Sequence, residues 1–194
     1  VIKERLNRQE RVFERTAEPQ PGLPLIQEQT KVFVLGKPGA GKSTFLRYIA
    51  YSVLNKKIKV KKVPVFIRLK DWLASELSLL DYTLERIEYG AGSINLKPFV
   101  EHHLKKGRFY FLLDGLDETT DEIRDAVQSI NAFMDQYNKN RFVISCRFGA
   151  IERRFREFTY IEIADLDDEQ QELFIRNWFS KEGNILPDFC GVNL

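Results

Sequence analysis

Residues 36–44 are the most informative segment for function. They read Gly-Lys-Pro-Gly-Ala-Gly-Lys-Ser-Thr and directly follow the apolar run 32–35. This is the pattern G-x-x-x-x-G-K-[ST], the P-loop, which connects a buried strand to a helix. Its glycines let backbone N–H groups face a phosphate chain, and the helix N-terminus adds donors and a positive dipole end. Lys42 is expected to reach the β- and γ-phosphates, and the Ser43 hydroxyl to bind Mg²⁺. The residues predicted to line the nucleotide are Gly36, Pro38, Gly39, Ala40, Gly41, Lys42, Ser43 and Thr44.

A second group of candidate residues ends the apolar run 109–113, where the chain reads Asp114-Gly115-Leu116-Asp117-Glu118. Ligands of open α/β sheets bind at the carboxyl ends of the strands, so these acids should face the P-loop. Asp114 is predicted to hold Mg²⁺, usually through water, beside the P-loop serine. Asp117 and Glu118 lie beyond it, where either could orient the attacking water, and spacing leaves open which one does.

Arg147 is the third element, directly after the apolar segment 141–146. If that segment is a strand beside the P-loop strand, the guanidinium lies next to the γ-phosphate and can sense or stabilise it. Cys146, at the end of the same segment, is interpreted as a core residue.

The elements that must position these residues alternate between strand and helix. Apolar runs predict strands at 31–36, 63–69, 109–114, 141–146 and 159–163. Helical patterns follow the P-loop and recur within 72–106, 121–137, 150–157 and 168–181. Residues 1–18 are expected to form a short helix and lead-in, and the prolines and glycine of 19–24 to break regular structure.

Strand character predicts the order of the sheet. The first, third and fourth strands are continuously apolar, as in a parallel sheet with helices on both faces. The second contains Pro64 and the fifth alternates polar and apolar residues, so both are expected at edges. We predict a three-layer α/β P-loop NTPase with a five-stranded parallel sheet in the order 2-3-4-1-5.

Composition sets outer bounds on function. The 194 residues contain 43% hydrophobic and 30% charged residues, which suits one large globular domain, and the net charge of +2 favours no polyanionic partner. Cys146 and Cys190 lie far apart, so a reducing, cytoplasmic setting is expected. No apolar run approaches a membrane span, and no membrane partner is expected. The lysine run 56–62 is interpreted as a solvated loop, without direct nucleic-acid binding. The segment 138–141 has arginine where a guanine-specifying N-K-x-D element needs aspartate.

Taken together, these segments resemble the NACHT family of STAND P-loop NTPases, particularly the many-domain proteins of bacteria such as cyanobacteria. The resemblance rests on residues 34–46, on Phe111–Glu118, on 142–147, which match the family's sensor 1, and on 166–179. It implies that Lys42, Ser43 or Thr44, Asp114 and Arg147 contact nucleotide and Mg²⁺, and that Asp117 or Glu118 is the hydrolytic acid.

The resemblance also implies a role. It predicts an ADP-held resting state, ATP-promoted self-assembly, and flanking effector and sensor domains in a larger signalling protein of defence or regulated cell death. A winged-helix domain should follow. We expect a lead-in at residues 1–30, the NACHT core at 31–166 and the start of a helical subdomain at 167–194. The predicted activity is slow ATP hydrolysis; the alternatives are a P-loop small-molecule kinase and a nucleotide-binding scaffold without hydrolysis.

Overall fold

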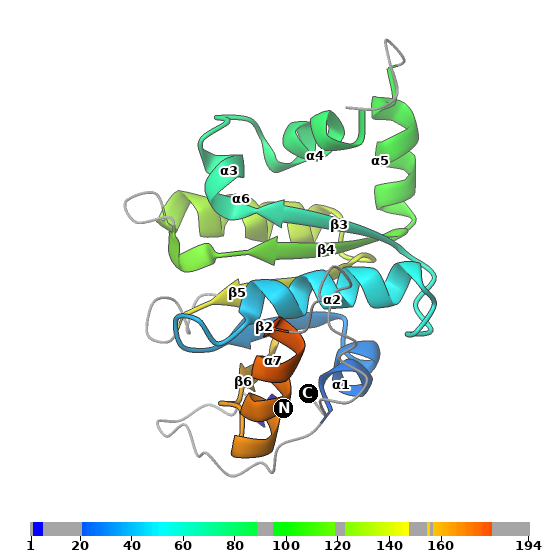
Figure 1. Ribbon diagram of the computed structural model, residues 1–194. Coiled ribbons are helices and arrows are strands. Elements are labelled where there is room, and N and C mark those ends of the chain that lie inside the picture. The colour runs from blue at the N-terminus through cyan, green and yellow to red at the C-terminus, as the bar shows by residue number, and fades with distance from the viewer. Residues whose placement is uncertain are drawn as a thin grey trace.

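The computed structural model describes residues 2–5, 21–88, 95–118, 123–147, 155 and 157–179. At its centre lies a six-stranded sheet flanked by helices (Figure 1). The strands are β1 (Ile2–Arg5), β2 (Lys31–Leu35), β3 (Val63–Arg68), β4 (Phe109–Asp114), β5 (Arg141–Cys146) and β6 (Thr159–Ile163). The helices are α1 (Gly22–Glu28), α2 (Lys42–Leu54), α3 (Leu69–Leu73), α4 (Leu79–Glu88), α5 (Lys97–Lys105), α6 (Ile123–Gln136) and α7 (Asp168–Phe179), with a 3-10 turn η1 (Leu116–Glu118) after β4.

The strand order is β1-β6-β2-β5-β4-β3, and β2 to β6 run parallel. These five strands stand in the predicted order 2-3-4-1-5, so the α/β class and the core topology are confirmed. Strand β3, which contains Pro64, forms one edge as predicted. An edge strand has no neighbour on its outer side, so a proline whose nitrogen faces outward leaves no partner strand without a hydrogen bond.

The other edge differs from the prediction. Strand β1 pairs antiparallel with β6, placing Ile2 opposite Ile163 and Arg5 opposite Tyr160. The predictions of helix at residues 2–5 and of β6 at an edge are therefore wrong. Four residues with three charged side chains carry no strand pattern of their own. Their conformation follows from pairing with the outer backbone groups of β6, a long-range interaction.

Helix α1 is a further difference, because its residues include the proline and glycine expected to break regular structure. Gly22 and Pro24 occupy the first turn of α1. The N–H groups of a first helical turn have no partner within the helix, so a proline there removes no hydrogen bond. Leu25 and Ile26 of α1 are buried against the sheet.

Two buried clusters divide the core between the faces of the sheet. Along β2, Val32 and Val34 face one cluster while Phe33 and Leu35 face the other, as strand alternation requires. Helices α1 and α2 supply the first cluster, and α3 to α6 supply the second (Figure 1). This arrangement confirms the predicted three layers.

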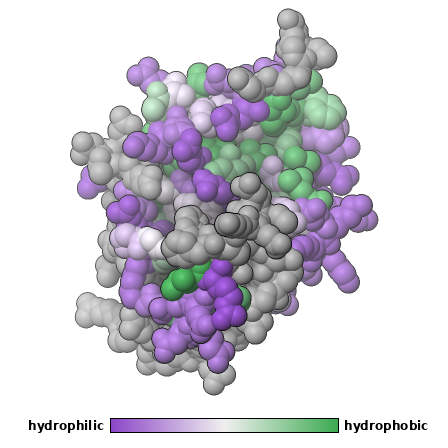
Figure 2. Space-filling view, in the orientation of Figure 1, coloured by the Kyte–Doolittle hydropathy of each residue, from purple (hydrophilic) through white to green (hydrophobic). Residues whose placement is uncertain are grey.

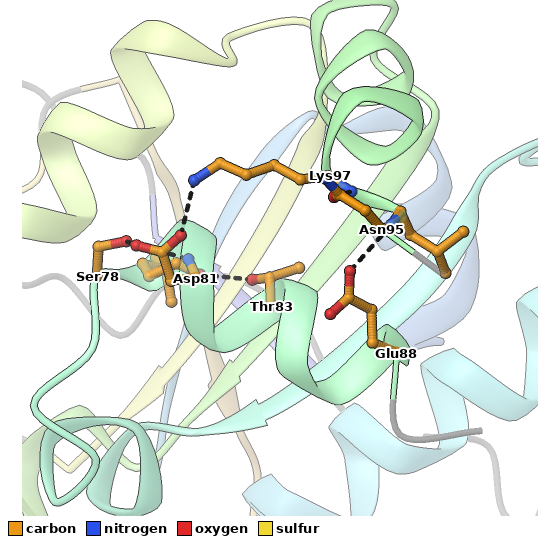
Figure 3. Close-up of polar contacts among 8 residues, drawn as sticks. Ser78, Asp81, Thr83, Glu88, Asn95 and Lys97 are labelled. Carbon is orange, nitrogen blue, oxygen red and sulfur yellow. Dashed lines mark hydrogen bonds and ion pairs between the residues drawn. The ribbon is translucent and has the colours of Figure 1, made fainter. Parts of the chain in front are cut away.

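The helical region predicted at 72–106 is divided into α3, α4 and α5. Polar contacts connect α4 and α5: Lys97 Nζ donates to Asp81 Oδ1 at 3.1 Å, and the Leu96 N–H donates to Glu88 Oε1 at 3.1 Å (Figure 3). Helices α6 and α7 confirm the predicted segments within the described residues. The helix predicted at 150–157 falls largely outside them.

Candidate nucleotide site

Three neighbouring strands bring the predicted site residues together at the end of the sheet where these strands finish. The P-loop follows β2, Asp114 ends β4 and Arg147 follows β5, and β5 lies between β2 and β4. Because these strands are parallel, their carboxyl ends meet at the same edge. Lys42, Ser43, Asp114, Asp117 and Arg147 therefore gather around one site from segments up to a hundred residues apart.

The P-loop adopts a backbone that depends on its glycines. Gly39 and Gly41 have φ angles of 76° and 88°, in the left-handed region that strains other residues. A Cβ at Gly36 would lie 3.3 Å from the Ala40 Cβ, tight enough to displace the loop. The Ala40 N–H donates to the Lys37 carbonyl at 3.1 Å, which closes the turn before α2. The loop conformation is thus specified by the residues that the motif requires.

Lys42 is the first residue of α2, and its ammonium group lies against the loop. Lys42 Nζ donates to the carbonyls of Gly36 and Lys37, both at 2.9 Å. Burial lowers the pKa of Lys42, and nearby Arg147 lowers it further, while Asp117 opposes the shift. A negative group placed at this loop would therefore offset an unfavourable environment for the lysine charge.

Asp114 is the buried carboxylate of the site, with 8% of its surface exposed. Its Oδ1 accepts hydrogen bonds from Ser43 Oγ at 3.0 Å and from Ser145 Oγ at 2.6 Å. Ser145 in turn accepts from the Gly115 N–H at 2.9 Å. The carboxylate is held between the P-loop helix and β5.

This donor set fits Mg²⁺. Ser43 Oγ and Asp114 Oδ1 are 3.0 Å apart, so a hydroxyl that could bind the ion directly lies beside a carboxylate that could hold it through water. Groups of three acidic, histidine or cysteine side chains able to hold a metal alone do not occur among the described residues. Remaining ligands would have to be phosphate oxygens and water, the usual situation for Mg²⁺ at nucleotide sites.

Asp117 and Arg147 form a two-point ion pair. Arg147 Nε lies 2.8 Å from Asp117 Oδ2, and the Arg147 backbone N–H donates to Asp117 Oδ1 at 2.8 Å. The Asp117 side chain is 9% exposed, whereas that of Arg147 is 51% exposed. Both residues lie at the site as predicted, but each is engaged with the other. Glu118 ends η1, and its side chain lies outside the described part of the chain.

Sequence reasoning gave Ser145 no separate role. Its signal is that it is the one hydroxyl in the apolar interior of β5. The contact between Lys37 Nζ and Asp165 Oδ2, at 2.6 Å, was also missed, and with both side chains more than half exposed it contributes little stability. Burial raises the pKa of the Cys146 thiol to about 12, which supports its interpretation as a core residue.

Two other features lie away from the site. Arg141 belongs to the segment that was compared with a guanine-specifying element. It is the first residue of β5, at the end of the strand away from the P-loop, and donates to the Gln27 carbonyl at 2.8 Å. It cannot read a base at the P-loop. An open cavity of about 530 Å³ lies beside α4 and includes no P-loop residue. It is lined by Leu77, Asp81, Leu84, Glu85, Glu88, Asn95 and Lys97, several of them drawn in Figure 3.

Several solved structures are similar to this chain. A DNA replication initiation factor is similar with a TM-score of 0.50 and 15% identity, covering 80% of this chain and 46% of that one. AMPPCP-bound DnaA from Aquifex aeolicus has a TM-score of 0.47 and 16% identity, covering 84% and 49%. A signal transduction ATPase with numerous domains (STAND), with a tetratricopeptide repeat sensor, from Pyrococcus horikoshii has a TM-score of 0.41 and 18% identity, covering 97% and 28%.

At such identities the likeness concerns the fold alone, and the chain spans about half or less of the length of these structures. No curated protein matches the chain in sequence. The family comparison is decisive, because the NACHT domain model matches residues 30–182, which include the P-loop, Asp114 and Arg147. The chain belongs to the NACHT family and contains its P-loop nucleotide-binding domain.

Proposed function

We propose that this domain binds ATP and ADP with Mg²⁺ and hydrolyses ATP slowly, as a conformational switch controlling self-assembly of a larger signalling protein. The observation that carries the proposal is the hydrogen-bonded set of Ser43, Asp114 and Ser145 beside the P-loop. In this set Ser43 and Asp114, the two residues proposed to hold Mg²⁺, are in direct contact, which supports a metal site beside the P-loop. The switching role and a function in defence or regulated cell death rest on the family resemblance, and the proposed cytoplasmic location rests on the two distant cysteines.

Each residue has a distinct part in the proposed mechanism. The P-loop backbone and Lys42 bind and orient the phosphate chain, and Ser43 and Asp114 hold Mg²⁺. When bound, Mg²⁺ neutralises phosphate charge. Asp117 or Glu118 orients a water molecule and accepts its proton, and Arg147 contacts the γ-phosphate. The predicted domain limits, 1–30, 31–166 and 167–194, remain part of the proposal.

The ion pair between Asp117 and Arg147 supports slow turnover. Asp117 Oδ1 and Oδ2 each accept one hydrogen bond from Arg147, from its backbone N–H and its Nε. In the proposed mechanism this pair loosens before Asp117 orients water or Arg147 reaches the phosphate. Such a preceding step reduces the fraction of molecules competent for hydrolysis. It also makes Glu118 the better candidate for the hydrolytic acid.

The test separates binding from hydrolysis in single variants. Asp114→Asn should weaken Mg²⁺-dependent nucleotide binding, measured by calorimetry with and without the metal. Glu118→Gln should leave binding intact and reduce phosphate release by about 10²–10⁴-fold if the general base is lost. Asp117→Asn should retain binding and alter the rate through Arg147.

Three outcomes would contradict the proposal. Full hydrolysis by the Asp117→Asn/Glu118→Gln double variant would place the hydrolytic acid elsewhere. Tight nucleotide binding without any measurable phosphate release in the unmodified domain would favour the scaffold. Transfer of phosphate from ATP to an added small-molecule acceptor would favour the kinase.

A further inference from the structure

Basic side chains from three loops lie together where the strands begin, at the end of the sheet opposite the P-loop. Segments 55–62, 104–108 and 137–141 precede β3, β4 and β5, and none of them contains an acidic residue. Because these strands are parallel, the three loops meet at one edge. We define the basic edge by its exposed cations, which are Lys56, Lys57, Lys59, Lys61, Lys105, Lys106, Arg108 and Lys139.

Direct contacts hold the three loops together. Lys62 Nζ donates to the Gly107 carbonyl and, at 3.0 Å, to the Lys139 carbonyl, so one side chain bridges all three segments. Asn140, 1% exposed, accepts from the Phe109 N–H at 3.0 Å and donates to the Leu104 carbonyl at 2.8 Å. The basic edge is therefore a fixed platform.

The charge at this edge is concentrated rather than general. The whole chain has a net charge of only +2, so the surplus of cations here is balanced by acids elsewhere. Burial lowers the pKa of Lys62, and the adjacent Arg141 and Arg108 lower it further. Like charges gathered at one edge repel one another, and an anionic surface lying against them relieves this cost.

Exposed apolar side chains lie beside these cations. Leu54, the last residue of α2, is 68% exposed, and Val63, the first residue of β3, is 55% exposed. They lie at the two ends of the lysine-rich loop. Tyr51, 39% exposed, has the Lys57 ammonium 5.2 Å from its ring centroid. In Figure 2 this edge, on the right of the view, is formed mainly by hydrophilic residues.

We propose that the basic edge docks on the surface of a bilayer that contains anionic lipids. Seven of its eight exposed cations are lysines, whose flexible point charges suit a disordered layer of headgroups better than they suit base recognition. Leu54 and Val63 provide exposed apolar groups beside the lysines, where they can enter the interface between lipid headgroups and acyl chains. Among the described residues, Tyr51 is the exposed aromatic side chain beside these cations, and Lys57 already lies over its ring, which disfavours its use for stacking a base.

This attachment would be peripheral. None of the described helices combines the length and apolar composition needed to cross a bilayer. The basic edge and the nucleotide site lie at opposite ends of the same strands, so docking would leave the P-loop accessible. The proposal departs from the sequence-based expectation of a solvated lysine loop and no membrane partner, because the fold adds two further basic loops beside the lysine run.

The test uses the chain as it stands and sedimentation with lipid vesicles. Vesicles of phosphatidylcholine with about a third phosphatidylserine should bind the protein at low salt and release it as salt rises, whereas pure phosphatidylcholine should bind much less. The double variant Lys59→Glu/Lys61→Glu should reduce partitioning by about 25-fold or more, since each lysine near such a surface contributes about fivefold. Leu54→Ser should reduce it by roughly fivefold through lost apolar insertion.

Matched control variants make the same kinds of substitution, two charge reversals and one apolar-to-serine change, outside the basic edge. Lys70→Glu/Arg86→Glu alters two exposed cations outside the basic edge, and Ile175→Ser alters an apolar residue of α7 that is 55% exposed. Both should partition like the unmodified chain. Equal binding to neutral and anionic vesicles, no binding to either, or equal losses in patch and control variants would overturn the proposal. Salt-dependent binding of a DNA or RNA oligonucleotide without vesicle binding would also overturn it, and would identify a nucleic-acid surface.

Discussion

At the scale of single residues, Lys42 shows how the site places a positive charge where phosphate is expected. Its ammonium donates to two carbonyls of the P-loop, and burial lowers its pKa. A bound phosphate chain would replace these neutral acceptors with charged ones. The lysine is therefore positioned before ligand arrives, although its present contacts are made within the protein.

The first prediction concerns this charge. Lys42→Ala should weaken ADP binding by about 10–150-fold, since a charge-assisted hydrogen bond contributes roughly 1.5–3 kcal/mol. Calorimetric titration measures the change directly. Lys37→Ala is the control, because the Lys37 side chain is 58% exposed and paired with Asp165, so its loss should change affinity less than about threefold. Unchanged ADP affinity in Lys42→Ala would remove this lysine from the site.

Ser145 is the residue that positions Asp114. Its hydroxyl donates to a buried carboxylate at 2.6 Å and cannot be replaced by water without a change in packing, because Ser145 is fully buried. Ser145→Ala should weaken Mg²⁺-dependent ATP binding by roughly tenfold, the effect of losing one hydrogen bond to a charged group. Binding measured without the metal should change much less.

A control for this second prediction lies in α2. Ser52 is also fully buried, but its hydroxyl has no hydrogen-bond partner among the described residues. Ser52→Ala should therefore keep both affinities and should not lower stability. If the two alanine variants lost the same metal-dependent affinity, Ser145 would have no specific role at the site.

At the scale of elements, Gly107 connects α5 to β4 in a backbone that only glycine adopts easily. Its φ is 66°, and an added Cβ would lie 2.3 Å from the Lys139 carbonyl oxygen. Gly107→Ala should lower the free energy of unfolding by about 2–4 kcal/mol, from left-handed strain and from displacement of the 138–140 turn. Urea unfolding measures it. Lys106→Ala, at the adjacent exposed position, should stay within about 0.5 kcal/mol, and an equal effect in both variants would contradict this reason.

The elements that could be predicted are those whose own residues determine them. Three of the five parallel strands are continuously apolar, and their central places follow from this, while Pro64 and the alternation of β6 indicated the outer places of the other two. Strand β1 could not be predicted, because its charged residues become a strand only through pairing with β6. Helix α1 was missed because the effect of Pro24 depends on its position in the helix, which composition does not reveal.

The same distinction holds for the site. Lys42, Ser43 and Asp114 belong to local motifs whose spacing reflects their chemistry, so their positions could be predicted. The engagement of Asp117 with Arg147 joins residues thirty positions apart, and depends on how η1 packs beside β5. The role of Ser145 likewise needs the knowledge that β5 lies between β2 and β4.

At the scale of the whole molecule, the two edges of the sheet have opposite chemistry. The carboxyl ends of the strands carry the P-loop with Asp114, Asp117 and Arg147, and the loops before β3, β4 and β5 at the amino ends carry basic residues without acids. A nucleotide-dependent change at the first edge has to reach the second through elements that connect them, among which are the strands and α2. These are also the most deeply buried elements. The amino edge is therefore expected to act as a fixed support, while loops at the carboxyl edge respond to nucleotide.

The last prediction concerns the stability of the chain with ligand. Because ligand binds only the folded state, a nucleotide at a hundred times its Kd should stabilise the domain by about 2.7 kcal/mol. For a chain of this size the melting midpoint should rise by roughly 5–11 °C. ADP with Mg²⁺ should give this shift, and chelation of Mg²⁺ should reduce it because the contact through Ser43 and Asp114 is lost. GDP should give less, and an equal or larger GDP shift would contradict the proposed adenine preference.

Light scattering in the same samples should show a monomer. Stable oligomers formed with ATP alone would show that this segment assembles without the winged-helix domain, against the proposed switch.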